Sequence, residues 1–141
     1  MLNFLNTPSF GIMQKNLDIL AQRINITGQN ITNAETPHYK AKKLEYENLF
    51  QEKLAALNNS YTMQLKYSGE KNKEKLREYL GSVEPTVFTD DRTETRTDGN
   101  NVDIDYENLE LARTQLQYNF MVRKITDEYN LLRHAISEGR Q

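Results

Sequence analysis

The chain has 141 residues, 37% of them hydrophobic and 27% charged, with a net charge of −2 and no cysteine. The lack of cysteine excludes a disulfide framework and a thiolate metal site. A mean hydropathy of −0.81 and the absence of tryptophan argue against a large compact core and favour an elongated shape.

The first long segment predicts a helix that opens at Thr7-Pro8, a capping residue followed by proline. It is expected to end near Asn33 to Glu35, because Thr36-Pro37 cannot continue a helix. Its apolar positions alternate three and four residues apart, as in the a/d seam of a coiled coil. These positions are Phe10, Met13, Leu17, Leu20, Ile24, Thr27, Ile31 and Ala34. A helix of this kind needs a helical partner.

The middle of the chain predicts short elements joined by turns. Residues 44–57 have the apolar spacing of a short amphipathic helix, and Tyr61 to Tyr67 alternates like a half-buried strand. Residues 70–80 are charge-dense and fit either a short exposed helix or a loop. Val83 to Phe88 suggests a short extended piece, and Asp98-Gly99 predicts a turn with left-handed dihedrals.

The last third predicts a second long helix, which begins after an N-cap at Asp103 or Asp105 and ends at Gly139. Glu107 and Glu110 lie where the helix dipole favours negative charge. The apolar positions again repeat at four and three: Leu111, Gln115, Tyr118, Val122, Ile125, Tyr129, Leu132 and Ile136.

The predicted fold class is therefore mainly α, with the N- and C-terminal helices paired as an antiparallel coiled coil around a small irregular β- and turn-rich middle region. Residues 1–34 and 103–141 form the two helices, and residues 35–102 form a joint and an outer region. Burial by one pair of helices only just offsets the backbone entropy of ordering them, so the seam is expected to bind further copies as well. The predicted assembly seam consists of Met13, Leu17, Leu20, Ile24, Ile31, Tyr118, Val122, Ile125, Tyr129, Leu132 and Ile136.

Catalytic chemistry is not indicated. His38 and His134 are the only histidines, and neither has a second ligand at metal-site spacing. The oxygen-rich stretch from Asp98 to Asp103 does not match the spacing of an EF-hand loop. The chain is therefore predicted not to be an enzyme and to bind no cofactor or metal.

The charge pattern and the N-terminus bear on partners and location. A global basic footprint for nucleic acid is missing, and the small cluster Lys40, Lys42 and Lys43 is interpreted as a solvated face. The N-terminus has no secretory signal pattern, and no apolar run approaches the length of a membrane-spanning helix. We therefore expect a protein that does not span a membrane and leaves the cytoplasm, if at all, without a cleaved signal peptide.

Two motifs resemble one known family. The segment Asn30-Ile-Thr-Asn-Ala-Glu-Thr-Pro-His-Tyr-Lys40 resembles the signature that follows the N-terminal helix in bacterial flagellar rod and hook proteins. The segment Arg96-Thr-Asp-Gly-Asn-Asn-Val-Asp103, followed by Gln115-Leu-Gln-Tyr-Asn119, is similar to basal body rod proteins of the FlgB type. The matching positions are Asn30, Asn33, Thr36, Pro37, Tyr39, Asp98, Gly99, Asn100, Asn101, Val102 and Asp103. His38 replaces the family's usual glycine, which histidine tolerates at a steric cost if the turn needs a positive φ there.

The resemblance implies a structural subunit of the proximal rod of the flagellum, assembled through its terminal helices into a helical tube that transmits torque. It implies location in the basal body rod within the periplasmic space and export through the flagellar type III apparatus without a cleaved signal. Implied partners are further copies, other proximal-rod subunits and the adaptor that joins the rod to the membrane ring. The alternative from a different class is a soluble adaptor or export chaperone that binds amphipathic helices of flagellar clients.

Overall fold

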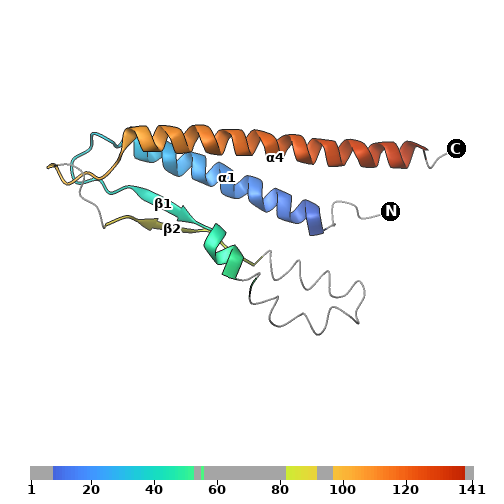
Figure 1. Cartoon of the computed structure of the whole chain (residues 1–141), viewed down its shortest axis with the longest axis horizontal. Coiled ribbons are helices and arrows are strands. Elements are labelled where there is room, and N and C mark those ends of the chain that lie inside the picture. The colour runs from blue at the N-terminus through green and yellow to red at the C-terminus, as the bar shows by residue number, and fades with distance from the viewer. Residues whose placement is uncertain (1–7, 53–54, 56–81, 92–96, 139–141) are drawn as a thin grey trace.

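Two long helices dominate the computed structural model, which describes residues 8–52, 55, 82–91 and 97–138. Helices α1 (Pro8–Thr32) and α4 (Ile104–Glu138) lie side by side and run in opposite directions (Figure 1). Strands β1 (Lys42–Glu45) and β2 (Thr86–Thr89) form an antiparallel sheet beside α1, on the side away from α4 (Figure 1). The predicted fold class, mainly helical with paired terminal helices and a small strand and turn region, is confirmed.

The helix ends follow local sequence signals. α1 begins at Pro8 and ends at Thr32, one residue before the predicted stop, and Gly28 does not interrupt it. Asp103 is the N-cap of α4, since its Oδ1 accepts hydrogen bonds from the backbone N–H groups of Asp105 (3.0 Å) and Tyr106 (3.1 Å). The predicted capping residue Thr7 lies outside the described residues.

Helix α1 is buried on two sides, of which the sequence analysis identified one. On the side facing the sheet, Ile19 is 4% exposed and packs with Tyr46 and Val83, while Leu44, Leu49 and Phe50 surround this apolar cluster. Of the predicted seam, Met13, Leu17, Leu20, Ile24 and Ile31 are each half-buried. The side facing the sheet was missed because it also carries Arg23 and Asn30, which break its apolar pattern.

The predicted helix over 44–57 is wrong at its start. Leu44 and Glu45 belong to β1 and pair with Val87 and Thr86 of β2, and the helical residues begin at 47. Leu44 and Tyr46 both pack against the apolar cluster, which is the period of a strand. The partner strand lies about forty residues later, so local spacing could not reveal the pairing.

The remaining predictions for the middle region have different outcomes. The extended piece predicted at Val83 to Phe88 is confirmed in its second half, since β2 spans Thr86–Thr89. The strand predicted at Tyr61 to Tyr67 and the helix or loop at 70–80 lie outside the described residues.

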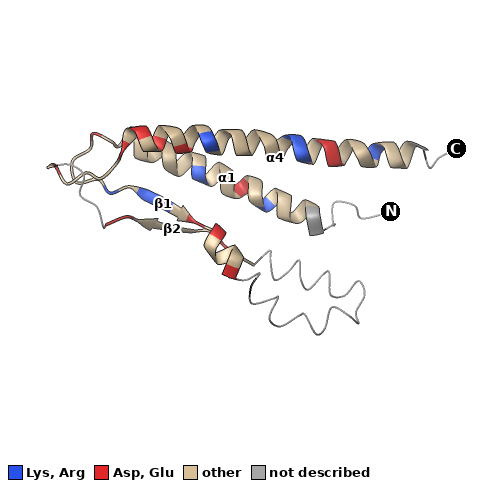
Figure 2. Cartoon of the chain, viewed as in Figure 1, with Lys and Arg blue, Asp and Glu red and all other residues tan. Residues whose placement is uncertain are grey.

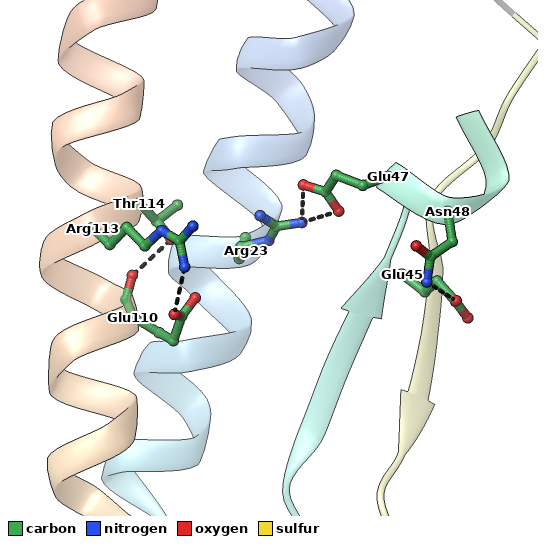
Figure 3. A network of polar contacts seen from close by, with 7 residues as sticks. All are labelled: Arg23, Glu45, Glu47, Asn48, Glu110, Arg113 and Thr114. Carbon is green, nitrogen blue, oxygen red and sulfur yellow. Dashed lines mark hydrogen bonds and ion pairs between the residues drawn. The ribbon is translucent and has the colours of Figure 1, made fainter. Parts of the chain in front are cut away.

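Ion pairs join the middle region to α1. Arg23 Nη2 contacts both carboxylate oxygens of Glu47, at 2.6 and 2.7 Å (Figure 3), and Lys15 Nζ lies 2.7 Å from Glu84. The carboxylates of both pairs are mostly exposed, so each pair contributes at most about 1 kcal/mol. The apolar cluster therefore supplies most of the attachment. None of the helices in the described part of the chain is both long and apolar enough to cross a bilayer.

Candidate functional site: the joint and the exposed seam

The two family motifs meet at one end of the molecule, where α1 ends and α4 begins, and Asn30 lies at their centre. Its side chain is 1% exposed, and its Nδ2 donates to the Lys42 carbonyl oxygen (2.8 Å) and to Glu107 Oε1 (3.1 Å). Its Oδ1 accepts from the Lys42 N–H (2.9 Å) and from the Tyr39 hydroxyl (3.2 Å). One amide therefore connects α1, β1 and α4. We call the region from Asn30 to Lys42, together with Thr97 to Glu107, the joint.

Asn100 holds the chain after α1 in its turn. It is fully buried, and its Nδ2 donates to the carbonyl oxygens of Asn33 (3.0 Å), Ala34 (3.0 Å) and Thr36 (2.9 Å). Its Oδ1 accepts from the Val102 N–H (2.7 Å). The carbonyl groups freed where α1 ends thus find their partner in the second motif.

Asn101 connects the two strand ends in the same way. Its Oδ1 accepts from the Ala41 N–H at 2.7 Å, and its Nδ2 donates to the Asp90 carbonyl oxygen. The Asp90 N–H in turn donates to the Ala41 carbonyl oxygen (2.9 Å). Among the described residues, no buried side-chain nitrogen or oxygen of the structure lacks a hydrogen-bond partner.

Two left-handed residues face each other across the joint. His38 has φ 60°, the positive value expected if the family's turn places glycine there, and Gly99 has φ 78°. The His38 N–H donates to the Asp98 carbonyl oxygen at 3.0 Å. A Cβ added at Gly99 would lie 2.9 Å from His38 Nδ1. Gly99 therefore provides both the dihedral angle and the room for the histidine ring.

Glu107 is a buried carboxyl at the start of α4, with 6% of its surface exposed. Burial raises the pKa of Glu107 above its ordinary value, while the hydrogen bond from Asn30 and the charge of Lys43 oppose that rise. Burial and the nearby negative charge of Glu107 also raise the pKa of Tyr39. The negatively charged form of Glu107 is therefore energetically unfavourable in the joint.

The other predicted motif residues lie around these bonds. Val102 is buried with Ala34 and Ala41, and Tyr39 packs against them. Asn33 Nδ2 donates to the Gln29 carbonyl oxygen, and Thr36 and Pro37 are exposed in the turn.

Four further residues hydrogen-bond to the motif asparagines and were not among the predicted motif residues: Ala41, Lys42, Asp90 and Glu107. Glu107 had been explained by the helix dipole alone. No local signal marks it as the partner of Asn30.

The apolar seam of α4 continues past the end of α1. The two helices run in opposite directions from the point where Asn30 contacts Glu107. Pro8 lies 22 positions before Asn30, and Tyr129 lies 22 positions after Glu107, so Tyr129 is level with the start of α1. Residues 130–138 therefore extend beyond the first residue of α1, as Figure 1 shows. Tyr129 is 58% exposed and Ile136 is 65% exposed.

Exposure alternates along the predicted seam positions of α4. Tyr118, Ile125 and Leu132 are half-buried, whereas Val122 is 40% exposed. We call residues 129–138, with Tyr129, Leu132 and Ile136 on one face, the overhang.

An apolar groove of about 570 Å³ lies between α1, α4 and the helical residues that follow β1. On its α4 side, Leu116 is 71% exposed and Phe120 is 68% exposed. The groove is lined by Asn16, Ile19, Leu20, Tyr46, Glu47, Phe50, Gln51, Leu116, Gln117, Phe120 and Met121. The joint is thus suited to holding two helices at a fixed angle, and the overhang and groove are suited to contacts with other chains.

Comparison with known proteins identifies the family. No family model matches the chain. The chain is similar to the flagellar basal body rod protein FlgB of Bacillus subtilis, with 32% identity over 114 residues, 79% of each chain. It is 33% identical to FlgB of Borrelia hermsii over 113 residues, 78% of this chain and 82% of the relative. It is 27% identical to FlgB of Aeromonas hydrophila over 124 residues, 84% and 87% of the two chains. Since the similarity reaches 32–33% identity and covers about four fifths of both chains, the chain belongs to the FlgB family of flagellar basal body rod proteins.

Proposed function

We propose that this chain is a structural subunit of the proximal rod, which assembles with further copies through α1 and α4 into a helical tube that transmits torque. The observation that carries this proposal is the uncovered seam of α4. A helix whose apolar positions continue for about two and a half turns beyond its partner is suited to a second helix from another chain.

The fold supports different roles for different parts of the subunit. We assign residues 1–34 and 103–141 to the inner tube, because both contribute to the seam. We assign residues 35–102, which include the turns of the joint, to the outer part of the subunit, because β1 and β2 lie on the side of α1 away from α4 (Figure 1).

The joint supports the mechanical part of the proposal. A subunit that transmits torque must keep its two helices at a constant angle under load. Asn30 and Asn100 together form eight hydrogen bonds across the joint, and both side chains are buried. Bonds of this kind are strong in the low-dielectric interior and constrain geometry.

The remaining parts of the proposal concern partners and location. The neighbours would be copies of this chain, other proximal-rod subunits and the adaptor of the membrane ring. The subunit would reach the periplasmic space through the flagellar type III apparatus without a cleaved signal. Membership of the FlgB family supports these points.

The test compares the chain with Tyr129→Asp, which places a charge in the uncovered seam, and with Asn119→Asp as an exposed control on the same helix. Sedimentation velocity over a concentration series should show open-ended association of the wild type and the control and loss of association in Tyr129→Asp. A strain carrying Tyr129→Asp should lose motility, whereas the control strain should swim. A chain that stays monomeric at every concentration, or that forms only a defined complex with a client helix, would support an adaptor or chaperone instead.

A further inference from the structure

The overhang continues the contact between the two helices beyond the first residue of α1. Tyr129 is level with the start of α1, and Leu132 and Ile136 follow it on the same face. Leu132 is half-buried, whereas Tyr129 is 58% exposed and Ile136 is 65% exposed. Within the described part of the chain, no helix lies against this face past Tyr129, although α1 and α4 pack together up to that level (Figure 1).

The segment immediately before α1, residues 1–7, lies outside the described residues and has the composition that this face needs. It carries no charged side chain, and four of its side chains are apolar: Met1, Leu2, Phe4 and Leu5. It is joined to α1 at Pro8, where the overhang begins. Seven residues span roughly 10 Å as a helix and at most roughly 23 Å when extended. The distance from Tyr129 to Ile136 along α4 is also roughly 10 Å, so the segment is long enough to reach Ile136.

The other segments outside the described residues are less suited to the overhang. Residues 92–96 and 139–141 have no apolar side chain. Residues 56–81 lead into Val83, which packs with Ile19 on the side of α1 that faces the sheet, away from α4 (Figure 2). Ile19 lies 11 positions after the start of α1, which is roughly 16 Å further from the overhang. A long loop from there would cost more closure entropy than a direct continuation of α1.

A second copy of the chain is the other candidate occupant, and tethering decides between the two. A segment joined directly to α1 has an effective concentration at the overhang on the order of millimolar. A second copy matches this only when the subunit is equally concentrated or when further surfaces of that copy contribute to binding. The contact within one chain is therefore favoured in the free subunit.

We infer that residues 1–7 cover the overhang of their own chain in the free subunit and compete there with a second copy. This inference rests on the proposed function, in which the seam of α4 receives another chain. The apolar side chains of the segment pack against Leu132 and Ile136. A second copy must displace the segment before its own helix occupies this face, so the segment holds back association of the free subunit.

Disulfide trapping tests the contact, since the chain has no cysteine of its own. The test variant carries Leu5→Cys and Leu132→Cys, and the matched control carries Leu5→Cys and Leu131→Cys. Leu131 lies roughly 100° around the helix from Leu132 and is 69% exposed. Cα atoms must come within about 7 Å for a disulfide to form. Mild oxidation at a concentration where the chain is monomeric should therefore close an intrachain disulfide in the test variant and leave the control reduced.

A non-reducing gel and a count of free thiols measure the linking. Dimers linked through Leu132→Cys would identify a second copy as the occupant and overturn the inference. Equal linking in the test and control variants, or no linking in either, would also overturn it.

The competition is tested by removing the apolar side chains of the segment. Leu2→Asn combined with Leu5→Asn should lower the concentration needed for association at least about threefold, because a larger fraction of subunits then has an open overhang. Asn3→Ser combined with Asn6→Ser, in the same segment, should leave it unchanged. Sedimentation velocity over a concentration series measures both, and a concentration that rises or stays the same in the leucine variant would contradict the competition.

The outcomes separate this inference from the proposed function, because intrachain linking is measured in the monomer. Association without intrachain linking overturns the covering of the overhang and leaves rod assembly standing. Intrachain linking in a chain that associates at no concentration supports the contact and overturns the proposed function, and the competition with it.

Discussion

Asn30 and Glu107 lie 77 positions apart in the chain, yet the Nδ2 of Asn30 donates a hydrogen bond to Oε1 of Glu107 at 3.1 Å. The same side-chain amide also forms hydrogen bonds with both the N–H and the carbonyl oxygen of Lys42. Asn30 therefore joins the end of α1, the start of β1 and the start of α4 through a single side chain.

Replacing Asn30 with alanine should destabilise the fold by about 3 kcal/mol, because it leaves buried backbone and carboxylate groups without partners. The free energy of unfolding, measured with urea at a concentration where the chain is monomeric, gives the value. Asn25→Ala, at an exposed position of the same helix, should change it by less than about 0.5 kcal/mol. Similar losses in the two variants would show that the joint does not depend on Asn30.

The raised pKa of Glu107 predicts a dependence of stability on pH. The unfolded carboxyl has a pKa of about 4.3, whereas the folded one holds its proton to higher pH. The folded state therefore binds more protons between these two pKa values, and this contribution to stability is lost as the pH rises through the folded pKa.

Glu107→Gln removes this titration and retains an oxygen that accepts the Asn30 hydrogen bond. The free energy of unfolding of the wild type should fall relative to that of Glu107→Gln as the pH rises above about 4.3, and the difference should level off above the folded pKa. Urea titrations from acid to neutral pH measure it. Parallel curves for the two proteins would contradict the assignment.

Two glycines should respond to alanine in opposite directions. At Gly99 the methyl group meets His38 and the φ of 78° disfavours alanine, so Gly99→Ala should destabilise by about 1–3 kcal/mol. At Gly28 a Cβ has nothing within 4 Å and the residue is helical, so Gly28→Ala should stabilise by up to about 1 kcal/mol. Thermal unfolding of both variants tests the pair, and a loss of stability in Gly28→Ala would count against the uninterrupted helix.

The sheet should depend on the apolar cluster more than on its ion pairs. Ile19→Ala, which opens a cavity against Tyr46 and Val83, should cost about 2–4 kcal/mol. A double-mutant cycle on Arg23 and Glu47 should give a coupling below about 1 kcal/mol, since the glutamate side chain is 63% exposed. A coupling larger than the loss in Ile19→Ala would reverse this ranking.

Much of the fold could be predicted from local signals. Pro8 and Thr36-Pro37 bound α1, and Asp103 caps α4, because capping and proline chemistry act within a few residues. Asp98-Gly99 marks the turn for the same reason. The motif residues of the joint were identified through their resemblance to a known family. Their chemistry alone would not have identified them.

The rest depends on residues that are distant in sequence. β1 was taken for the start of a helix, because Leu44 and Tyr46 fit either period until β2 and Ile19 are in place. The polar residues Arg23 and Asn30 concealed the second buried side of α1. Each finds its partner, Glu47 or Glu107, only when another element packs beside α1.

The sequence by itself determined where α1 begins and ends, where α4 begins, and where the chain turns at Asp98-Gly99. These properties follow from backbone sterics and short-range periodicity. The tertiary structure decided that Asn30 and Glu107 form a hydrogen bond, that α1 is covered on two sides, and that α4 extends beyond the first residue of α1. These relationships depend on how elements separated by many residues pack together, and no local pattern contains that information.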